Sequence, residues 1–135
     1  MNWRRYFLAL AITSLATLVA DVLLNAVIFR DVFRRSADVL LPAHQLNARV
    51  PLGWGALLVI VAAFGLLLVK TDLRGVRGGF VFGSVLAVAS IAGVAGIASV
   101  VAWPTELLVA IGVQQVVNSL LLGVVFGVVY QPRRS

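Results

Sequence analysis

Four long stretches of the chain are almost entirely apolar, and short polar segments separate them. They cover roughly residues 6–29, 53–69, 78–101 and 105–130. An α-helix of about 20 residues, rising 1.5 Å per residue, crosses the hydrocarbon core of a bilayer. The stretches lack the strict alternation of apolar and polar residues that is typical of membrane β-strands. The pattern therefore predicts an all-α protein, a single domain built as a bundle of four transmembrane helices.

The first loop, residues 30–50, has an amphipathic pattern of its own. Phe33, Ala37, Leu40 and Leu41 recur at helical spacing, with charged residues elsewhere on the helical wheel. This pattern predicts a short interfacial helix that lies on the membrane surface and ends at Pro42. A lid over a cavity is the alternative interpretation of the same segment, and the sequence leaves both open.

Small residues at intervals of four predict where the helices approach each other closely. Lipid tails are as apolar as leucine, so membrane helices associate through the packing of small residues and through interhelical hydrogen bonds. The third stretch carries two small-residue faces and the fourth carries one. The glycines expected to pack are Gly79, Gly83, Gly93, Gly96, Gly123 and Gly127. The spacing does not decide whether a face is used within one molecule or between two copies.

Polar residues within the apolar stretches gather on one face of the first helix and one face of the fourth. On both helices they recur mainly at steps of four residues, which places them on a common face. The predicted polar cluster consists of Thr17, Asp21, Asn25, Gln114, Gln115 and Asn118. In a chain that otherwise keeps polar residues out of these stretches, the two faces are expected to meet.

Asp21 is the only formal charge well inside a predicted span. Counted from the outer ends of their helices, Asp21 and Gln114 both lie roughly 12–14 Å deep. An ionised carboxylate at the bilayer centre raises the free energy of insertion by about 2.5–3.5 kcal/mol. We therefore expect Asp21 to be protonated, hydrogen-bonded to an amide, or open to a wet cavity. Its role stays open between a proton or ion site and a structural hydrogen bond between helices.

Composition and charge agree with a membrane protein. The chain has 135 residues, of which 61% are hydrophobic and 12% charged, whereas soluble domains have about 25% charged residues. The net charge of +6 would suit a nucleic-acid partner, but the basic residues form short clusters between apolar stretches. Clusters of this kind lie beside lipid headgroups, so membrane lipids and not nucleic acid are the expected partners.

The distribution of basic residues predicts the orientation in the bacterial inner membrane. Lysine and arginine accumulate in short cytoplasmic loops. One side would hold Arg4, Arg5, Lys70, Arg74, Arg77, Arg133 and Arg134, and the other Arg30, Arg34, Arg35 and Arg49. The excess on the first side predicts that both termini are cytoplasmic.

Reactive constellations are missing from the sequence. It has no cysteine, and His44 is its single histidine, which excludes thiolate chemistry and a histidine pair for metal or haem. No Ser–His–Asp set, phosphate-binding glycine loop or close pair of carboxylates stands out. Glu106 falls in the first turn of the fourth helix, where an acid interacts favourably with the helix dipole. Neither enzymatic activity nor a cofactor is expected.

Several short features are shared with a known group of proteins. They are the Trp-Arg-Arg start at residues 3–5, Asp21 with a polar Asn25 four residues later, Pro104, and the closing Gly123, Gly127 and Tyr130. On these features the chain resembles a family of small bacterial four-helix membrane proteins, a domain family of unknown function. That family often has histidine in place of Asn25 and brings no established activity. A weaker likeness is to small multidrug-resistance transporters, although Asp21 lies deeper here and the first loop is more basic.

Two functional hypotheses from different classes follow. The first is a non-enzymatic membrane protein that binds a lipid or a protein partner, or that organises an assembly as a homo-oligomer. The second is an oligomeric proton- or ion-coupled transporter of a small cationic solute, with Asp21 as the coupling residue.

Overall fold

The computed structural model of the protein describes residues 1–71, 73 and 75–130, and these form helices and connecting turns without a strand. In chain order the elements are α1 (Trp3–Leu23), the π-helix η1 (Leu24–Ile28), α2 (Arg30–Arg35), the 3-10 helix η2 (Ala37–Val39), α3 (Ala43–Lys70), α4 (Gly75–Ala98) and α5 (Thr105–Val129). Four helices, one of them α1 continued by η1, are long and apolar enough to cross a membrane. The predicted all-helical architecture with four long apolar helices is thus confirmed.

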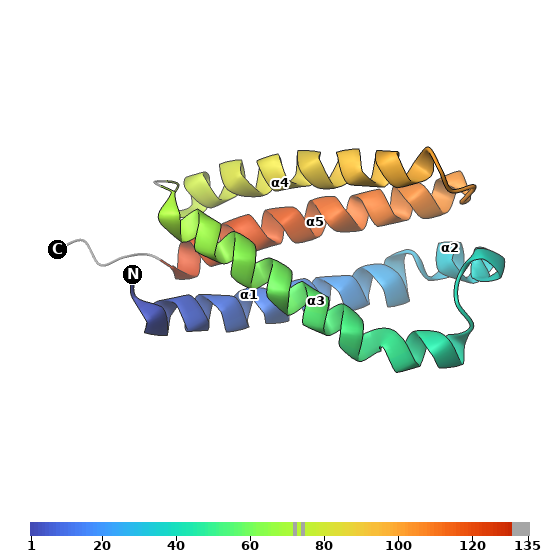
Figure 1. The fold of residues 1–135 in the computed structure, drawn as a ribbon, viewed down its shortest axis with the longest axis horizontal. Coiled ribbons are helices and arrows are strands. Elements are labelled where there is room, and N and C mark those ends of the chain that lie inside the picture. The colour runs from blue at the N-terminus through green and yellow to red at the C-terminus, as the bar shows by residue number, and fades with distance from the viewer. Residues whose placement is uncertain (72, 74, 131–135) are drawn as a thin grey trace.

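The four long helices form two unequal parts (Figure 1). The antiparallel pair α4 and α5 lies side by side and shares the most extensive interface. Helix α1 runs along α5, and α3 crosses α1 diagonally, so that one end of α3 is near the bundle and its other end diverges. The start of α1 and the end of α5 lie at the same end of the bundle, opposite α2.

Glycine allows the close approach of α4 and α5. A Cβ atom added at Gly83 would lie 2.7 Å from the Ser119 carbonyl oxygen, and one at Gly127 would lie 2.8 Å from the Gly75 carbonyl oxygen. The same holds between Gly79 and Gly123, whose backbones face each other directly. These contacts involve backbone atoms, so any larger residue would require the two helices to separate.

Gly93 and Gly96, which belong to the second predicted small-residue face, do not take part in this interface. A Cβ atom at either position would meet no atom within 4 Å. The reason is helical geometry: at 100° per residue, Gly93 is rotated roughly 80° away from the row that contains Gly83. Within a single molecule this second small-residue face of α4 contacts no other helix at these two positions.

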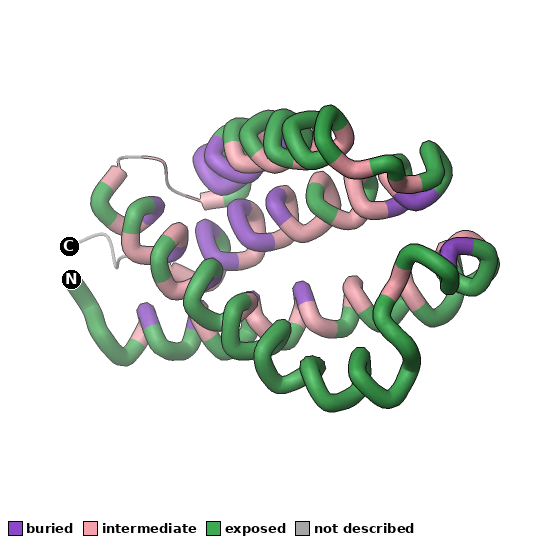
Figure 2. The backbone as a smooth tube through the Cα atoms, turned by 45° about the vertical axis from the view of Figure 1, so that its right-hand side comes forward, coloured by how far each residue is buried: buried purple, intermediate pink, exposed green. Residues whose placement is uncertain are grey.

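The first loop differs from its prediction. The expected helix over residues 33–41 is interrupted at Ser36, because α2 ends at Arg35 and only one 3-10 turn follows. Leu40 is extended, and the next helix begins directly after Pro42. Helix α3 therefore starts at Ala43, ten residues before the predicted span, and contains Pro51. The first part of α3 is exposed along its whole length (Figure 2).

The apolar core is concentrated at the end of the bundle that carries the termini. Phe126 of α5 is fully buried there, with its ring centroid 5.6 Å from that of Tyr6 on α1. Tyr6 also donates a hydrogen bond of 2.6 Å from its hydroxyl to the Ala62 carbonyl oxygen of α3. The other buried members of this cluster are Ala9, Val61, Leu68, Phe82 and Leu122. Toward the opposite end of the bundle, Leu24, Leu107 and Ala110 are also buried but do not belong to this cluster.

Candidate functional site

Asp21 lies between α1 and α5 and is bound by two amides of α5. Gln114 donates from Nε2 to Asp21 Oδ1 over 2.7 Å, and Asn118 donates from Nδ2 to the same oxygen over 2.6 Å. Gln114 and Asn118 are one helical turn apart, so both side chains reach the same point on the neighbouring helix. The two polar faces predicted from the sequence therefore meet at this carboxylate.

The other members of the predicted cluster do not bind Asp21. Thr17 is buried, and its hydroxyl donates to carbonyl oxygens of its own helix, at 2.9 Å to Thr13 and 3.0 Å to Ser14. Gln115 is exposed, since its position next to Gln114 turns it about 100° around the helix. Asn25 lies in η1, where the wider π-turn rotates the helix, and its enclosed Oδ1 has no hydrogen-bond partner among the described residues.

A cavity of about 440 Å³ opens beside Asp21. Its polar side is formed by α1 and α5, which contribute Thr17, Asp21, Gln114, Gln115, Asn118 and Ser119. Its apolar side is formed mainly by α3 and α4, including Leu57, Ile60, Phe64 and Leu86. The diagonal course of α3 leaves this space, because α3 departs from α4 toward its own start. The volume lies within the range typical of small-molecule sites.

Comparison of the chain with known protein families, with characterised proteins and with solved structures finds no match.

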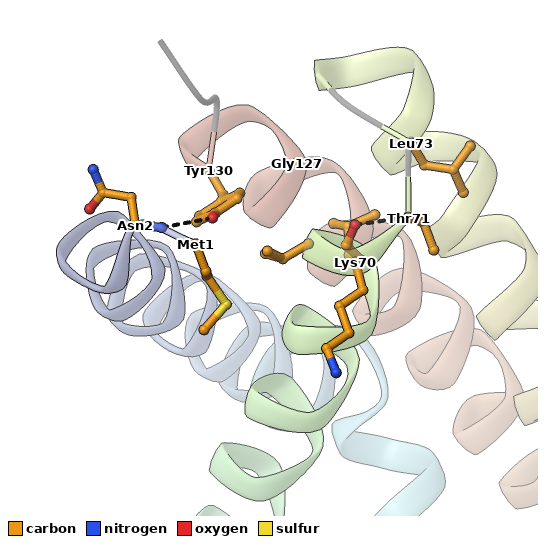
Figure 3. Close-up of a pocket in the computed structure, with 9 residues that line it drawn as sticks. Met1, Asn2, Lys70, Thr71, Leu73, Gly127 and Tyr130 are labelled. Atoms are coloured by element: carbon orange, nitrogen blue, oxygen red, sulfur yellow. Dashed lines mark hydrogen bonds between the residues drawn. The ribbon is translucent and has the colours of Figure 1, made fainter.

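A second cavity, of about 400 Å³, lies at the end of the bundle with the termini (Figure 3). It is lined by residues from four segments, among them Asn2, Lys70, Thr71 and Tyr130. The backbone N–H of Asn2 donates to the Tyr130 hydroxyl over 3.2 Å, and this bond joins the start of the chain to the end of α5. No acidic side chain lines this cavity among the described residues. The first cavity, with a carboxylate held by amides, is therefore the better candidate site.

Two further long-range contacts were not anticipated from the sequence. Arg35 of α2 pairs with Glu106 in the first turn of α5 at 2.8 Å, with both side chains about two-thirds exposed. The bond from Tyr6 to the Ala62 carbonyl was also missed. The partners in the two contacts are separated by 71 and 56 positions in the sequence, and no local pattern connects them. The exposed ion pair contributes little to stability, since such pairs are worth about 0–1 kcal/mol.

The cavity around Asp21 combines one acidic side chain with an apolar wall. No group of three or more His, Cys, Asp or Glu side chains able to hold a metal occurs within the described residues. His44 is exposed at the start of α3, and among the described residues that line the cavity Asp21 has no second carboxylate or histidine beside it. What the cavity offers is a hydrogen-bonded carboxylate next to an apolar wall, which together can hold an amphipathic molecule.

Proposed function

We propose that this chain is a non-enzymatic, multi-pass protein of the bacterial inner membrane. The outer surfaces of the four long helices carry many exposed large apolar residues, including Leu15, Val59, Val85 and Val88. Soluble proteins rarely expose contiguous apolar patches larger than a few hundred square ångströms, whereas a helix facing lipid is apolar by necessity. The resemblance to a four-helix family of unknown function stays a prediction.

The function that the geometry supports best is binding of a lipid or another amphiphile in the cavity around Asp21. The observation that carries this proposal is the division of the cavity into a polar side mainly on α1 and α5, joined by Ser90 of α4, and an apolar side mainly on α3 and α4. Because the outer part of α3 is exposed and packs against little else, an apolar chain can enter from the bilayer beside it. Binding through a second copy or another membrane protein is compatible with this proposal.

Filling the cavity from α3 is expected to remove the bound lipid. Ala56 lines the cavity and Ala63, seven residues later on the same helix, does not. We expect Ala56→Trp to lose one phospholipid that the wild type retains after reconstitution in mixed phosphatidylethanolamine and phosphatidylglycerol bilayers. Native mass spectrometry after transfer to detergent measures the retained lipid. Equal retention by Ala56→Trp and the matched control Ala63→Trp would show that lipid does not bind here.

Orientation is tested by accessibility. We propose that both termini are cytoplasmic, supported by Arg4, Arg5, Lys70 and Arg77 at one end of the bundle. Arg74, Arg133 and Arg134 belong to the same count but lie outside the described residues. The chain has no cysteine of its own. A cysteine at Asp38 should react with an impermeant maleimide on intact cells, and one at Ser135, also outside the described residues, only after permeabilisation. The reverse labelling pattern would invert the topology.

Coupled transport of a small cationic solute by an oligomer is the second candidate function. The observation that favours it is Asp21 itself, an acid that lines a cavity midway along the helices. Acids within membrane helices commonly mark ion or proton pathways. Accumulation of a cation in proteoliposomes, driven by an ion or proton gradient and lost in Asp21→Asn, would favour transport. Saturable binding without accumulation would favour the lipid-binding function.

A further inference from the structure

The cavity around Asp21 contains a charge that its surroundings do not balance. Of the described residues that line it, Asp21 alone carries a formal charge. The next basic residue along the chain is Arg30, nine positions later, which corresponds to about 14 Å of helix. Arg35 is engaged with Glu106 beyond that point. A molecule that enters the cavity therefore meets an acidic group with no protein cation next to it.

One oxygen of this acid remains available to a ligand. Gln114 and Asn118 both donate to Oδ1. Within the described part of the chain, no donor forms a hydrogen bond with Asp21 Oδ2. This oxygen is also absent from the set of fully enclosed polar atoms without a partner, so it is accessible. Since Asp21 lines the cavity, Oδ2 is the atom that a ligand would contact. An ionised carboxylate can only accept hydrogen bonds, so it selects a ligand group that donates them.

The neighbouring polar atoms add further acceptors. Gln114 donates a hydrogen bond from its amide N–H to Asp21, and its carbonyl oxygen remains as an acceptor. The hydroxyls of Ser90 and Ser119, which also line the cavity, lie 3.4 Å apart, and each keeps lone pairs. A primary ammonium group carries one positive charge and three N–H donors. It has no acceptor atom, so it does not need a hydrogen-bond donor from the cavity. It therefore matches both the charge and the acceptors of the cavity.

Other headgroups match less well. An anionic group would be repelled by Asp21 at close range in a medium of low dielectric constant. A quaternary ammonium has no N–H donor and is recognised mainly by aromatic rings that surround it. Phe64 is the single aromatic side chain among the described residues that line the cavity. The aromatic cage that such a cation requires is therefore not formed.

We infer that the cavity binds an amphiphile whose polar group is an ammonium with N–H donors, placed at Asp21 Oδ2. Its apolar chain would lie against Leu57, Ile60 and Phe64 on the α3 side. The inference rests on the proposed amphiphile-binding function and names the headgroup. Two sources carry this chemistry in a membrane: an alkylamine dissolved in the bilayer, and a phospholipid with an ethanolamine headgroup.

Two matched pairs of probes test the headgroup. Dodecylamine and dodecyltrimethylammonium share the chain and the charge and differ in N–H donors; phosphatidylethanolamine and phosphatidylcholine differ in the same way. The concentration dependence of the unfolding midpoint, measured in nanodiscs at pH 7, gives the affinity of each alkyl cation. Native mass spectrometry gives the preference between the lipids. We expect dodecylamine to bind about tenfold more tightly or better, as the loss of a hydrogen bond to a charged group implies.

Asp21→Asn should abolish this preference, whereas Asp38→Asn, in the exposed η2 turn, should keep it. Asn retains an acceptor for Gln114 and Asn118, so the variant should fold. If it does not fold, the binding of the matched probes to the wild type still tests the headgroup. Preference in the alkyl pair alone assigns a free amine, and preference in the lipid pair assigns the phospholipid. If the two members of each pair bound equally well, and Ala56→Trp still reduced their binding, the ammonium inference alone would be overturned. If no probe showed binding that Ala56→Trp reduces, the proposed function would be overturned as well.

Discussion

Replacing Gly123 by alanine is expected to force α4 and α5 apart and to lower the free energy of unfolding by roughly 3 kcal/mol, the upper end of the usual range for overpacked positions. The added Cβ would meet the Gly79 carbonyl oxygen directly, and it would lie 2.6 Å from the Gly83 nitrogen and 2.8 Å from its Cα. These are backbone atoms, which cannot rotate away as the end of a side chain can. The whole helix must move, and the loss extends along the interface.

Gly93→Ala is the matched control, because the same methyl group is added on α4 at a position with no atom within 4 Å. Alanine favours a helix over glycine by about 1 kcal/mol in water, so this variant should be as stable as the wild type or more stable. Reversible unfolding in mixed micelles, followed by circular dichroism, measures both variants. A loss in Gly93→Ala equal to that in Gly123→Ala would mean that α4 packs through its other face, as it could between two copies.

The four helices could be predicted from the sequence because a helix that is surrounded by lipid needs about 20 consecutive apolar residues to cross the bilayer. The prediction failed where helix and apolar stretch do not coincide. Helix α3 continues backwards through His44, Gln45 and Arg49, which hydropathy assigns to a loop. The helix also contains Pro51, although proline is tolerated best in the first turn of a helix.

The candidate site was partly predictable for a related reason. A polar residue within an apolar helix must find a partner, so spacing and depth were enough to bring Asp21 to Gln114 and Asn118. Spacing could not place Asn25, because the π-turn at residues 24–28 changes the helical register locally. It could not reveal the cavity either, since that volume depends on the angle at which α3 crosses the bundle. Crossing angles follow from the complete packing surface, not from one periodicity.

The position of α3 depends on one aromatic side chain. Phe126 is 0% exposed; its ring contacts Tyr6 of α1 edge to face and lies tilted against the ring of Tyr130 at the end of α5. A Cβ atom at Gly65 would collide with the same ring, so α3 packs against it through a glycine. Three helices thus meet at Phe126, near the end of α3 that stays with the bundle. The cavity lies farther along α3, where the helix diverges.

Truncating Phe126 to alanine should therefore loosen α3 and destabilise the protein by about 3 kcal/mol, the lower end of the range for Phe→Ala. The lower end applies because the unfolded membrane helix exposes this side chain to lipid and not to water, so no free energy of transfer from water is lost. The cost of the unfilled volume and of the lost ring contacts remains. Phe80→Ala is the control: Phe80 is 54% exposed on α4, and its removal should change the free energy of unfolding by less than about 0.5 kcal/mol. The same unfolding experiment measures both. If Phe80→Ala were as damaging as Phe126→Ala, the packed end of the bundle would not be the anchor of α3, and the wall of the Asp21 cavity would have to be held in place by contacts elsewhere.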